Sequence, residues 1–252
     1  MIPNRIATFF NLGDAPEPFK LWHYLCLHSM SVVNRPEDLV VLGAVEPRGE
    51  WWQRARRFAR FEAVPPVTAI FGNPLDHHAH RADVMRLQWL QRNGGIYLDL
   101  DTVCVRPLAP LLRERCVMAK EEGVGLCNAV ILSEARHSFL QAWLEEFRSF
   151  RGGWNSHAVI APWKVARFPE IAPTITILPQ SAFFEPRYDG PDLRDMHVND
   201  RPYPDAYSHH LWNTKAAAFL DSYTPESVMA GTSTFCRLTR PFLPCPSFRR
   251  RP

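Results

Sequence analysis

A short apolar run that ends in two acids most constrains the fold of this chain. Residues 94–101 read Gly-Gly-Ile-Tyr-Leu-Asp-Leu-Asp, so two glycines precede a predicted strand that ends at Asp99 and Asp101. Alternate side chains of an extended strand point to the same face, so both carboxylates are expected to face one way. Two such acids form an oxygen-rich site for a hard divalent cation such as Mg²⁺ or Mn²⁺. Because such a cation stabilises a diphosphate leaving group, the pair predicts an enzyme that acts on a phosphorylated substrate.

A predicted helix leads into this run. Residues 76–93 place apolar side chains at helical spacing, with Asp76 as the expected N-cap and Gly94-Gly95 as the stop. On that helix Asp83 and Arg86 are three residues apart and therefore share a face. The pair is interpreted either as a surface ion pair or as a clamp for hydroxyl and phosphate groups.

Short apolar runs alternate with helical patterns along the chain, which predicts an α/β fold. We expect a mainly parallel central sheet with helices on both faces, and a ligand site beyond the carboxyl ends of the strands. Besides the run at 94–101, strands are expected at 6–11, 38–42, 67–71, 116–120, 129–133 and 175–178. Besides the helix at 76–93, helices are expected at 19–33, 51–61, 137–150 and 214–220.

Composition agrees with one globular domain over residues 1–252. The chain is 46% hydrophobic and 22% charged, and its net charge of +3 is too small to predict nucleic-acid binding. The 23 prolines become denser after residue 160, where long irregular loops are expected. Six cysteines form no Cys-x-x-Cys pair, which indicates buried free thiols. Without a signal segment or a run of about 18 apolar residues, the expected location is cytoplasmic.

Three segments together resemble a known enzyme family. Asp83-x-x-Arg86 followed by Gly94–Asp101 is similar to the core motif of the sugar transferases with an Asp-x-Asp motif. That family includes yeast-type initiating mannosyltransferases, α-1,4-galactosyltransferases and bacterial capsule or lipopolysaccharide enzymes. Ile2–Ile6 resembles the family's first strand, although Thr8-Phe9-Phe10 replaces its usual polar-aromatic ending. Tyr207–Asn213 resembles its late His-x-Trp motif, with His210 in the His position.

The resemblance implies a GT-A type fold and a metal-dependent, retaining hexosyl transfer from a UDP- or GDP-linked sugar to a glycan or glycolipid. It implies that Asp101 binds Mn²⁺ or Mg²⁺ and that Asp99 contacts the ribose and the metal through water. Asp83 and Arg86 would hold the donor sugar's hydroxyls and the diphosphate. The nucleotide-sugar half would span about residues 1–135, and the acceptor half, with Pro-rich loops and a basic tail, about residues 136–252.

The resemblance also implies roles for other residues near the donor. His210 would approach the metal or diphosphate, with Trp212 packed beside it. Asn128 would face the transferred sugar, although a turn residue at a strand entry explains it equally well. Phe10 and Asn11, at the end of the first strand, are candidates for base or ribose contacts, and core packing explains Phe10 as well.

Several other features have two readings. The stretch 51–61 and the tail Phe248–Arg251 are basic, which favours either solvated surface or peripheral docking at the inner membrane face. The histidines at 77, 78 and 80 are read as helix-start residues, one of which lines the nucleotide pocket, rather than as a metal site. Of Glu121 and Glu122, at most one is expected to face the site as base or nucleophile.

Two other functions are consistent with the acid pair. Asp99-Leu100-Asp101-Thr102-Val103 fits the nucleophile motif of haloacid-dehalogenase-type phosphatases, with Asp99 as nucleophile and Asp101 as acid. That motif belongs on a first strand, and the later acids it needs, Asp192 and Asp195, lie in a predicted Pro/Gly-rich loop. A non-catalytic sugar-nucleotide binder is the third possibility.

Overall fold

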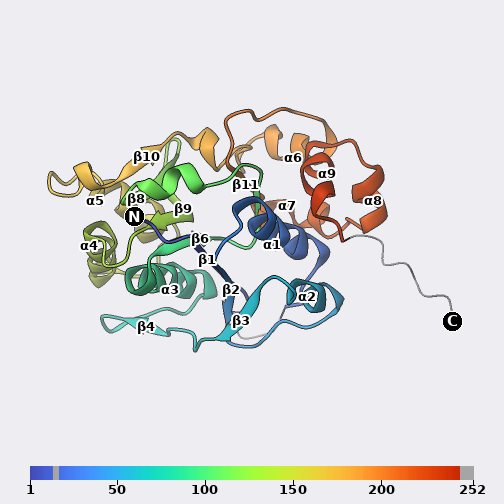
Figure 1. Ribbon diagram of the computed structural model, residues 1–252. Coiled ribbons are helices and arrows are strands. Elements are labelled where there is room, and N and C mark those ends of the chain that lie inside the picture. The colour runs from blue at the N-terminus through green and yellow to red at the C-terminus, as the bar shows by residue number, and fades with distance from the viewer. Residues whose placement is uncertain (14–16, 245–252) are drawn as a thin grey trace.

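A seven-stranded sheet forms the centre of the molecule in a computed structural model, which describes residues 1–13 and 17–244 (Figure 1). Its strands lie in the order β10-β8-β9-β6-β1-β2-β3. Their bounds are β1 (Arg5–Phe9), β2 (Asp38–Gly43), β3 (Arg60–Ala63), β6 (Gly95–Leu98), β8 (Cys116–Glu121), β9 (Gly125–Ser133) and β10 (Thr176–Leu178). Two small antiparallel pairs join β4 (Ala69–Ile70) with β5 (Asn73–Pro74) and β7 (Thr102–Cys104) with β11 (Ser208–His210).

The helices described in the structure are mostly short. They are α1 (Leu21–Asn34), α2 (Glu50–Ala55), α3 (His78–Asn93), α4 (Ser138–Glu146), α5 (Ala161–Val165), α6 (Pro191–Val198), α7 (Asn213–Leu220), α8 (Pro225–Ala230) and α9 (Thr234–Thr239). A π-helical turn, η3, spans Ser156–Ile160. The predicted alternation of strands and helices is therefore present.

The sheet is mainly parallel, as predicted. Parallel ladders join β6, β1, β2 and β3, and another joins β10 to β8. The exception is β9, which runs antiparallel to both of its neighbours, β6 and β8. Because β9 runs the other way, its amino end lies beside the carboxyl end of β6, where Leu98 pairs with Val130.

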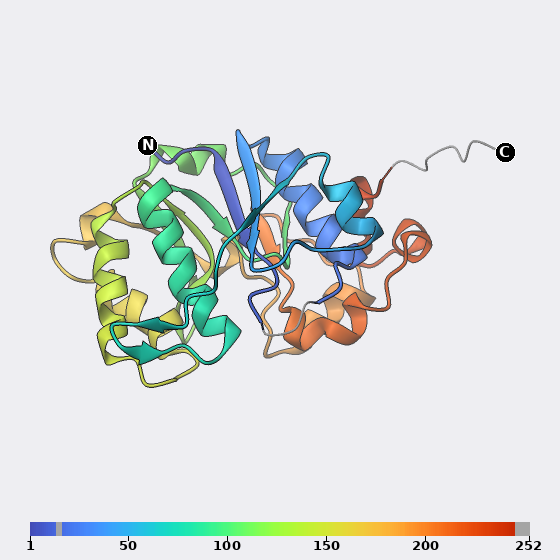
Figure 2. The same cartoon turned by 90° about the horizontal axis from the view of Figure 1, so that it is seen from below.

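Helices cover both faces of the sheet, and each face has its own core. Helices α1 and α2 pack on one face, while α3 and α4 pack on the other (Figure 2). Alternation along β2 supplies both cores, because Val41 belongs to the first and Val40 to the second. Trp143 of α4 and Met30 of α1 are fully buried on opposite faces. Burial on both faces explains why the strands read as continuous apolar runs.

The order of the strands creates a switch point between β1 and β6. From β1 the chain moves outward through β2 to β3, and it then returns through α3 to place β6 on the other side of β1. Crevices form at such points beyond the carboxyl ends of the strands, because the flanking helices lie on opposite faces. The residues after β1 and β6 therefore line one crevice.

Residues 51–61 do not form the single helix that we predicted. Helix α2 ends at Ala55, and the chain becomes extended again as β3, which pairs with Val40–Gly43 of β2. Pairing with β2 overrides the local helical pattern. Arg60 also forms an ion pair with Asp38 of β2 at 2.8 Å.

The strand predicted at 67–71 is wrong as well, because only Ala69–Ile70 is extended, and it belongs to a separate hairpin.

Other boundaries differ in smaller ways. The N-cap of helix α3 lies one residue later than predicted, because the side chain of His77, rather than that of Asp76, accepts the N–H of Ala79 at 3.1 Å. The first strand ends at Phe9 rather than at Asn11, since Asn11 has a φ of 58°. The predicted irregular region after residue 160 contains α5 to α9, so Asp192 and Asp195 lie on α6 rather than in a loop.

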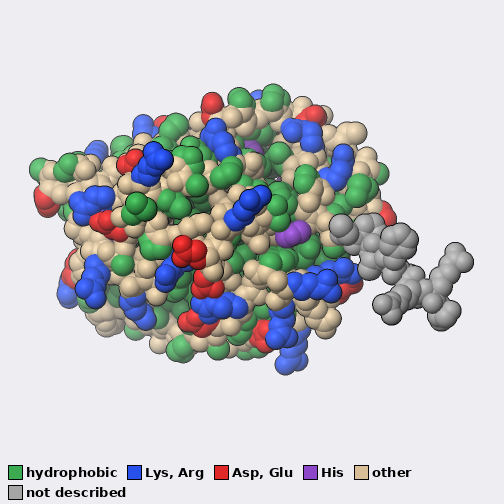
Figure 3. Space-filling model, in the orientation of Figure 1, with side chains coloured by type: hydrophobic (Ala, Val, Ile, Leu, Met, Phe, Trp, Pro, Cys, Tyr) green, Lys and Arg blue, Asp and Glu red, His purple; other side chains and the backbone are tan. Residues whose placement is uncertain are grey.

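The five cysteines in the described part of the chain are buried and free, as expected, whereas Cys245 and the basic tail at 248–251 lie outside it. No helix within residues 1–13 and 17–244 is long and apolar enough to cross a bilayer. Basic and acidic side chains are interspersed on the face seen in Figure 3.

Candidate active site

A tight turn, rather than strand alternation, brings Asp99 and Asp101 together. Strand β6 ends at Leu98, and the N–H of Thr102 donates to the carbonyl of Asp99 at 3.0 Å to close the turn. The N–H of Asp99 donates to the carbonyl of Ala129 on β9 at 2.8 Å, which anchors the turn to the sheet. The expected convergence is therefore present, but its predicted cause was wrong. Asp101 is buried, while the side chain of Asp99 is 25% exposed.

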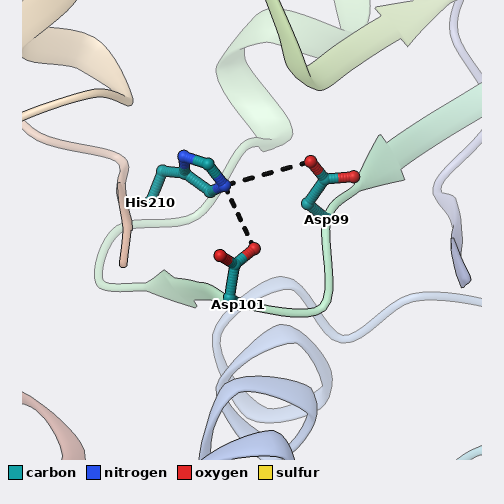
Figure 4. A group of neighbouring side chains, drawn as sticks. All are labelled: Asp99, Asp101 and His210. Atoms are coloured by element: carbon teal, nitrogen blue, oxygen red, sulfur yellow. Dashed lines mark ion pairs between the residues drawn. The ribbon is translucent and has the colours of Figure 1, made fainter. Parts of the chain in front are cut away.

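His210 completes the group from a strand far along the chain. Strand β11 pairs with β7 so that His210 lies opposite Thr102, and the N–H of Leu211 donates to the carbonyl of Asp101 at 2.8 Å. The imidazole Nε2 lies 3.1 Å from Asp101 Oδ1 and 3.9 Å from Asp99 Oδ2 (Figure 4). The chain thus brings together the three residues that were predicted to surround a metal.

The donor set of these three residues fits a divalent cation. One ligand atom from each of Asp99, Asp101 and His210 lies within 4.8 Å of the others. Burial disfavours the charged forms of Asp101 and His210, yet their attraction outweighs it, so the pKa of Asp101 is lowered and that of His210 is raised. The group is therefore arranged to hold positive charge between two carboxylates. Two carboxylates with one imidazole can hold a divalent metal ion.

Backbone groups of the following helix also orient Asp101. The N–H of Asn213, the first residue of α7, donates to Asp101 Oδ2 at 2.9 Å, which leaves Oδ1 facing His210. Trp212, the N-cap of α7, has a φ of 51°, and its indole packs 4.2 Å from the His210 ring. Its Nε1 donates to the carbonyl of Pro186 at 2.9 Å. Trp212 therefore packs beside His210 as predicted and helps fix the position of its ring.

A second buried network stands beside the acid pair. The guanidinium of Arg86 lies 3.0 Å from Asp99 Oδ1 and 3.4 Å from Asp83 Oδ1, and it donates to the carbonyl of Asn128 at 2.8 Å. The amide of Asn128 donates to Asp83 Oδ1 at 2.7 Å. The hydroxyl of Tyr97 donates to Asp99 Oδ1 at 2.6 Å. Arg86 is thus paired with neighbouring groups of the protein, and it fixes the orientation of the Asp99 carboxylate.

Burial sets the ionisation of this network. Removal from water raises the pKa of Asp83 to about 6, and the opposing effects of Arg86 and Asn128 do not restore its usual value. Burial also disfavours charge on Arg86, but Asp99 and its neighbours outweigh it and raise the pKa of the guanidinium. A carboxyl with a perturbed pKa in a cleft is typical of a functional site.

The two networks form the floor of one large cleft. Its cavity volume is about 620 Å³, within the range of small-molecule sites. At the β1 end the cleft is lined by Phe10, Asn11 and the residues of early α1, and at the β8–β9 end by Glu121, Asn128 and residues of η3. Every predicted site residue lines this cleft: Phe10, Asn11, Asp83, Arg86, Asp99, Asp101, Asn128, His210 and Trp212.

The residues predicted at the nucleotide end have structural contacts as well. Phe10 is buried and packs edge-on against Phe19, with ring centroids 5.2 Å apart. Asn11 Oδ1 accepts the N–H of Glu17 at 2.9 Å, so its amide holds the loop after β1. Their contacts to a base or ribose remain predictions.

Some residues in the cleft carry no recognisable pattern in the sequence. His23 of α1 is buried, and burial together with nearby Lys20 lowers its pKa to about 3, so it is neutral at pH 7. Tyr188 and Trp154 line the cleft from segments without a clear period.

Of the two predicted acids, Glu121 lines the cleft, and burial raises its pKa, while Glu122 is exposed. Of the three histidines, His78 and His80 line the cleft.

Comparisons with known proteins agree with this geometry. Residues 51–118 match the family model described as a glycosyltransferase sugar-binding region containing a DXD motif. Glucan organizing enzyme 1 of Cryptococcus neoformans var. grubii is 29% identical over 262 residues, which cover 96% of this chain and 71% of the relative. Mannosyl phosphorylinositol ceramide synthase SUR1 of Saccharomyces cerevisiae is 29% identical over 154 residues, which cover 61% of this chain but only 37% of that synthase.

A solved structure supports the expected architecture. The apo form of glycosyltransferase GlyE from Streptococcus pneumoniae TIGR4 superimposes with a TM-score of 0.57 at 11% identity, covering 95% of this chain and 60% of GlyE. At this identity the likeness shows the fold alone, and the predicted GT-A type fold is confirmed. Nothing in these matches supports the phosphatase alternative.

Proposed function

We propose that this chain, which belongs to the glycosyltransferase family with a DXD sugar-binding region, transfers a hexose from a nucleotide-diphosphate sugar to a glycan or glycolipid. The observation that carries the proposal is the convergence of Asp99, Asp101 and His210 on the floor of a cleft. The donor's diphosphate would lie over this group, with the base toward Phe10 and Asn11 and the sugar toward Asp83 and Asn128.

Each residue has a role that its contacts support. Asp101 and His210 would hold a divalent cation together with Asp99, and that cation would neutralise charge on the departing nucleoside diphosphate. Arg86 is a positioning residue, because its donors already serve Asp83, Asp99 and Asn128. Asp83 and Asn128 are oriented by one hydrogen bond and would read the donor sugar's hydroxyls.

We also propose which nucleotide sugar is the donor and which anomeric configuration the product has. Relatives whose names refer to mannosyl transfer, including inositol phosphoceramide mannosyltransferase 3 of Schizosaccharomyces pombe, which is 41% identical over 64 residues, favour GDP-mannose as the first donor to test. We expect retention of the anomeric configuration, with Mn²⁺ or Mg²⁺ as the cation. NMR of the product would show inversion if Glu121, which also lines the cleft, acts as a base toward the acceptor instead.

A donor panel tests the reaction class. Wild-type protein with Mn²⁺ is incubated with GDP-mannose and with UDP-linked galactose, glucose and N-acetylglucosamine, and release of the nucleotide is measured. We expect slow hydrolysis of one donor, loss of this activity in Asp101→Asn, and full activity in the exposed control Asp192→Asn. Cleavage of p-nitrophenyl phosphate with no donor turnover would instead indicate a phosphatase, and donor binding without turnover would indicate a binder.

The proposal includes a cellular location for the chain and a role for each of its two halves. We propose that residues of about 1–135 bind the donor and that residues of about 136–252 bind the acceptor, on the cytoplasmic side and in peripheral contact with the inner membrane face. The basic stretch at residues 51–61 would make this contact; its Arg54 and Arg56 lie at the surface, where they pair with Glu50 and Glu46. Co-sedimentation with anionic vesicles measures it, and binding that does not weaken with salt would contradict the electrostatic contact.

A further inference from the structure

One aromatic side chain in the cleft has little to pack against. Trp154 is 65% exposed and yet lines the same cleft as the acid pair. Within residues 1–13 and 17–244, the aromatic rings that its ring contacts are those of His77 and His80, both edge-on, at centroid distances of 5.2 Å and 5.9 Å. Among the residues that the structure describes, none accepts a hydrogen bond from its indole N–H. Because a large indole normally buries most of its surface, this placement favours a ligand.

The position of Trp154 along the sheet indicates which ligand. Asn11 follows β1, Asp99 follows the next strand β6, and Asn128 lies on β9 beyond it. Trp154 precedes η3, which is held against the β8–β9 hairpin so closely that a Cβ on Gly125 would lie 2.3 Å from the carbonyl oxygen of Val159. Trp154 therefore lies on the η3 side of the cleft, next to Asn155 and to His77 and His80 at the start of α3.

The chemistry around Trp154 suits a carbohydrate. The ring face of an indole carries negative potential, which attracts the C–H groups on one face of a pyranose. Asn155, His78 and Glu121 also line the cleft and can exchange hydrogen bonds with hydroxyls, whereas the apolar residues beside Trp154 and His78 are small: Ala79, Ala82, Ala158 and Val159. Burial lowers the pKa of His80, which favours the neutral imidazole. An acyl chain would need a more extensive apolar wall.

We propose that Trp154 is a stacking platform for a sugar ring of the acceptor glycan. This inference rests on the proposed function, because it names the acceptor side of the same cleft. It assigns Trp154 to acceptor affinity and not to donor binding or to bond cleavage.

Binding measurements separate these roles. Wild type, Trp154→Ala and Trp154→Phe are titrated calorimetrically with mannotriose, maltotriose and galactotriose, each in the presence of Mn²⁺ with GDP or UDP. We expect at least one trisaccharide to bind wild type, about tenfold or more weaker binding to Trp154→Ala, and a smaller loss in Trp154→Phe, which keeps a ring. Nucleotide affinity is expected to be equal in all three. Ile160→Ala is the matched control, because Ile160 is 49% exposed on the neighbouring turn and does not line the cleft.

Several results would overturn the platform. They are unchanged trisaccharide affinity in Trp154→Ala, an equal loss of nucleotide affinity, no trisaccharide binding to wild type, or Trp154-dependent binding to phosphatidylinositol vesicles alone. The donor panel without acceptor keeps the two proposals apart. Donor turnover by wild type with no effect of Trp154→Ala on acceptor binding would refute the platform only, whereas absence of any donor turnover would refute the transferase.

Discussion

Replacing Asp83 by Asn is expected to stabilise the fold above pH 7 while it lowers donor turnover. Asp83 is buried, its pKa is raised to about 6, and Arg86 compensates its charge only in part. An acid whose pKa is higher in the folded state binds its proton more tightly there than in the unfolded chain. Stability therefore falls as the pH rises from about 3.8 through about 6, and the loss is complete above that window.

The size of the stabilisation by Asp83→Asn follows from the shift in the pKa of Asp83. Moving from a model value of 3.8 to about 6 corresponds to about 3 kcal/mol of destabilisation by the ionised form. An asparagine carries no charge to desolvate, and its Oδ1 can still accept from the Asn128 amide. It loses the ion pair with Arg86, and one of its amide hydrogens faces the guanidinium, which we expect to cost about 1 kcal/mol. The net gain is therefore about 1–3 kcal/mol at pH 8, and it vanishes near pH 4.

Urea unfolding followed by circular dichroism at pH 8 and pH 4 measures this difference. Asp192→Asn, in which an exposed acid is replaced, serves as the control and should change stability by less than about 0.5 kcal/mol at both pH values. A Asp83→Asn protein that is less stable than wild type at pH 8, with an unchanged m-value, would refute the reasoning. It would mean that the ion pair with Arg86 outweighs the burial of the carboxylate.

Three further predictions follow from single contacts. Burial lowers the pKa of His197 to about 4, so the unfolded chain binds more protons than the folded protein between about pH 6.5 and pH 4. The wild-type protein therefore loses stability as the pH falls through that window. In urea unfolding, the stability of His197→Gln relative to wild type should rise by up to about 3 kcal/mol between pH 7 and pH 4. Gly125→Ala places a methyl group 2.3 Å from the carbonyl oxygen of Val159 and should cost about 1–3 kcal/mol, whereas Gly190→Ala, whose nearest atom is 3.9 Å away, should unfold like wild type. Asp101→Asn should weaken Mn²⁺ affinity about 100-fold in calorimetric titration while melting within a few degrees of wild type, and unchanged Mn²⁺ affinity would remove Asp101 from the metal site.

Local chemistry made the centre of the site predictable. The glycine stop, the apolar run and the two acids lie within eight consecutive residues, so their proximity needs no tertiary information. The pair Asp83 and Arg86 was predictable in the same way, because helical geometry places residues three apart on one face. The alternation of apolar runs with helical patterns was sufficient for the fold class, because burial of both sheet faces imposes it.

The third metal ligand and the walls of the cleft were decided in three dimensions. His210 reaches Asp101 because β11 pairs with β7, more than a hundred residues earlier in the chain, and the resemblance to a family, rather than any local pattern, indicated it. The extended segment at Arg60–Ala63 and the burial of Arg86 likewise depend on neighbours that are remote in sequence. Trp154 and Tyr188 lie in segments without periodicity. The sequence by itself determined which acids lie together at the rim of the sheet, because residues two positions apart in the chain stay close in any fold. Only the tertiary structure decided what surrounds them, because burial, charge compensation and strand pairing act between distant parts of the chain.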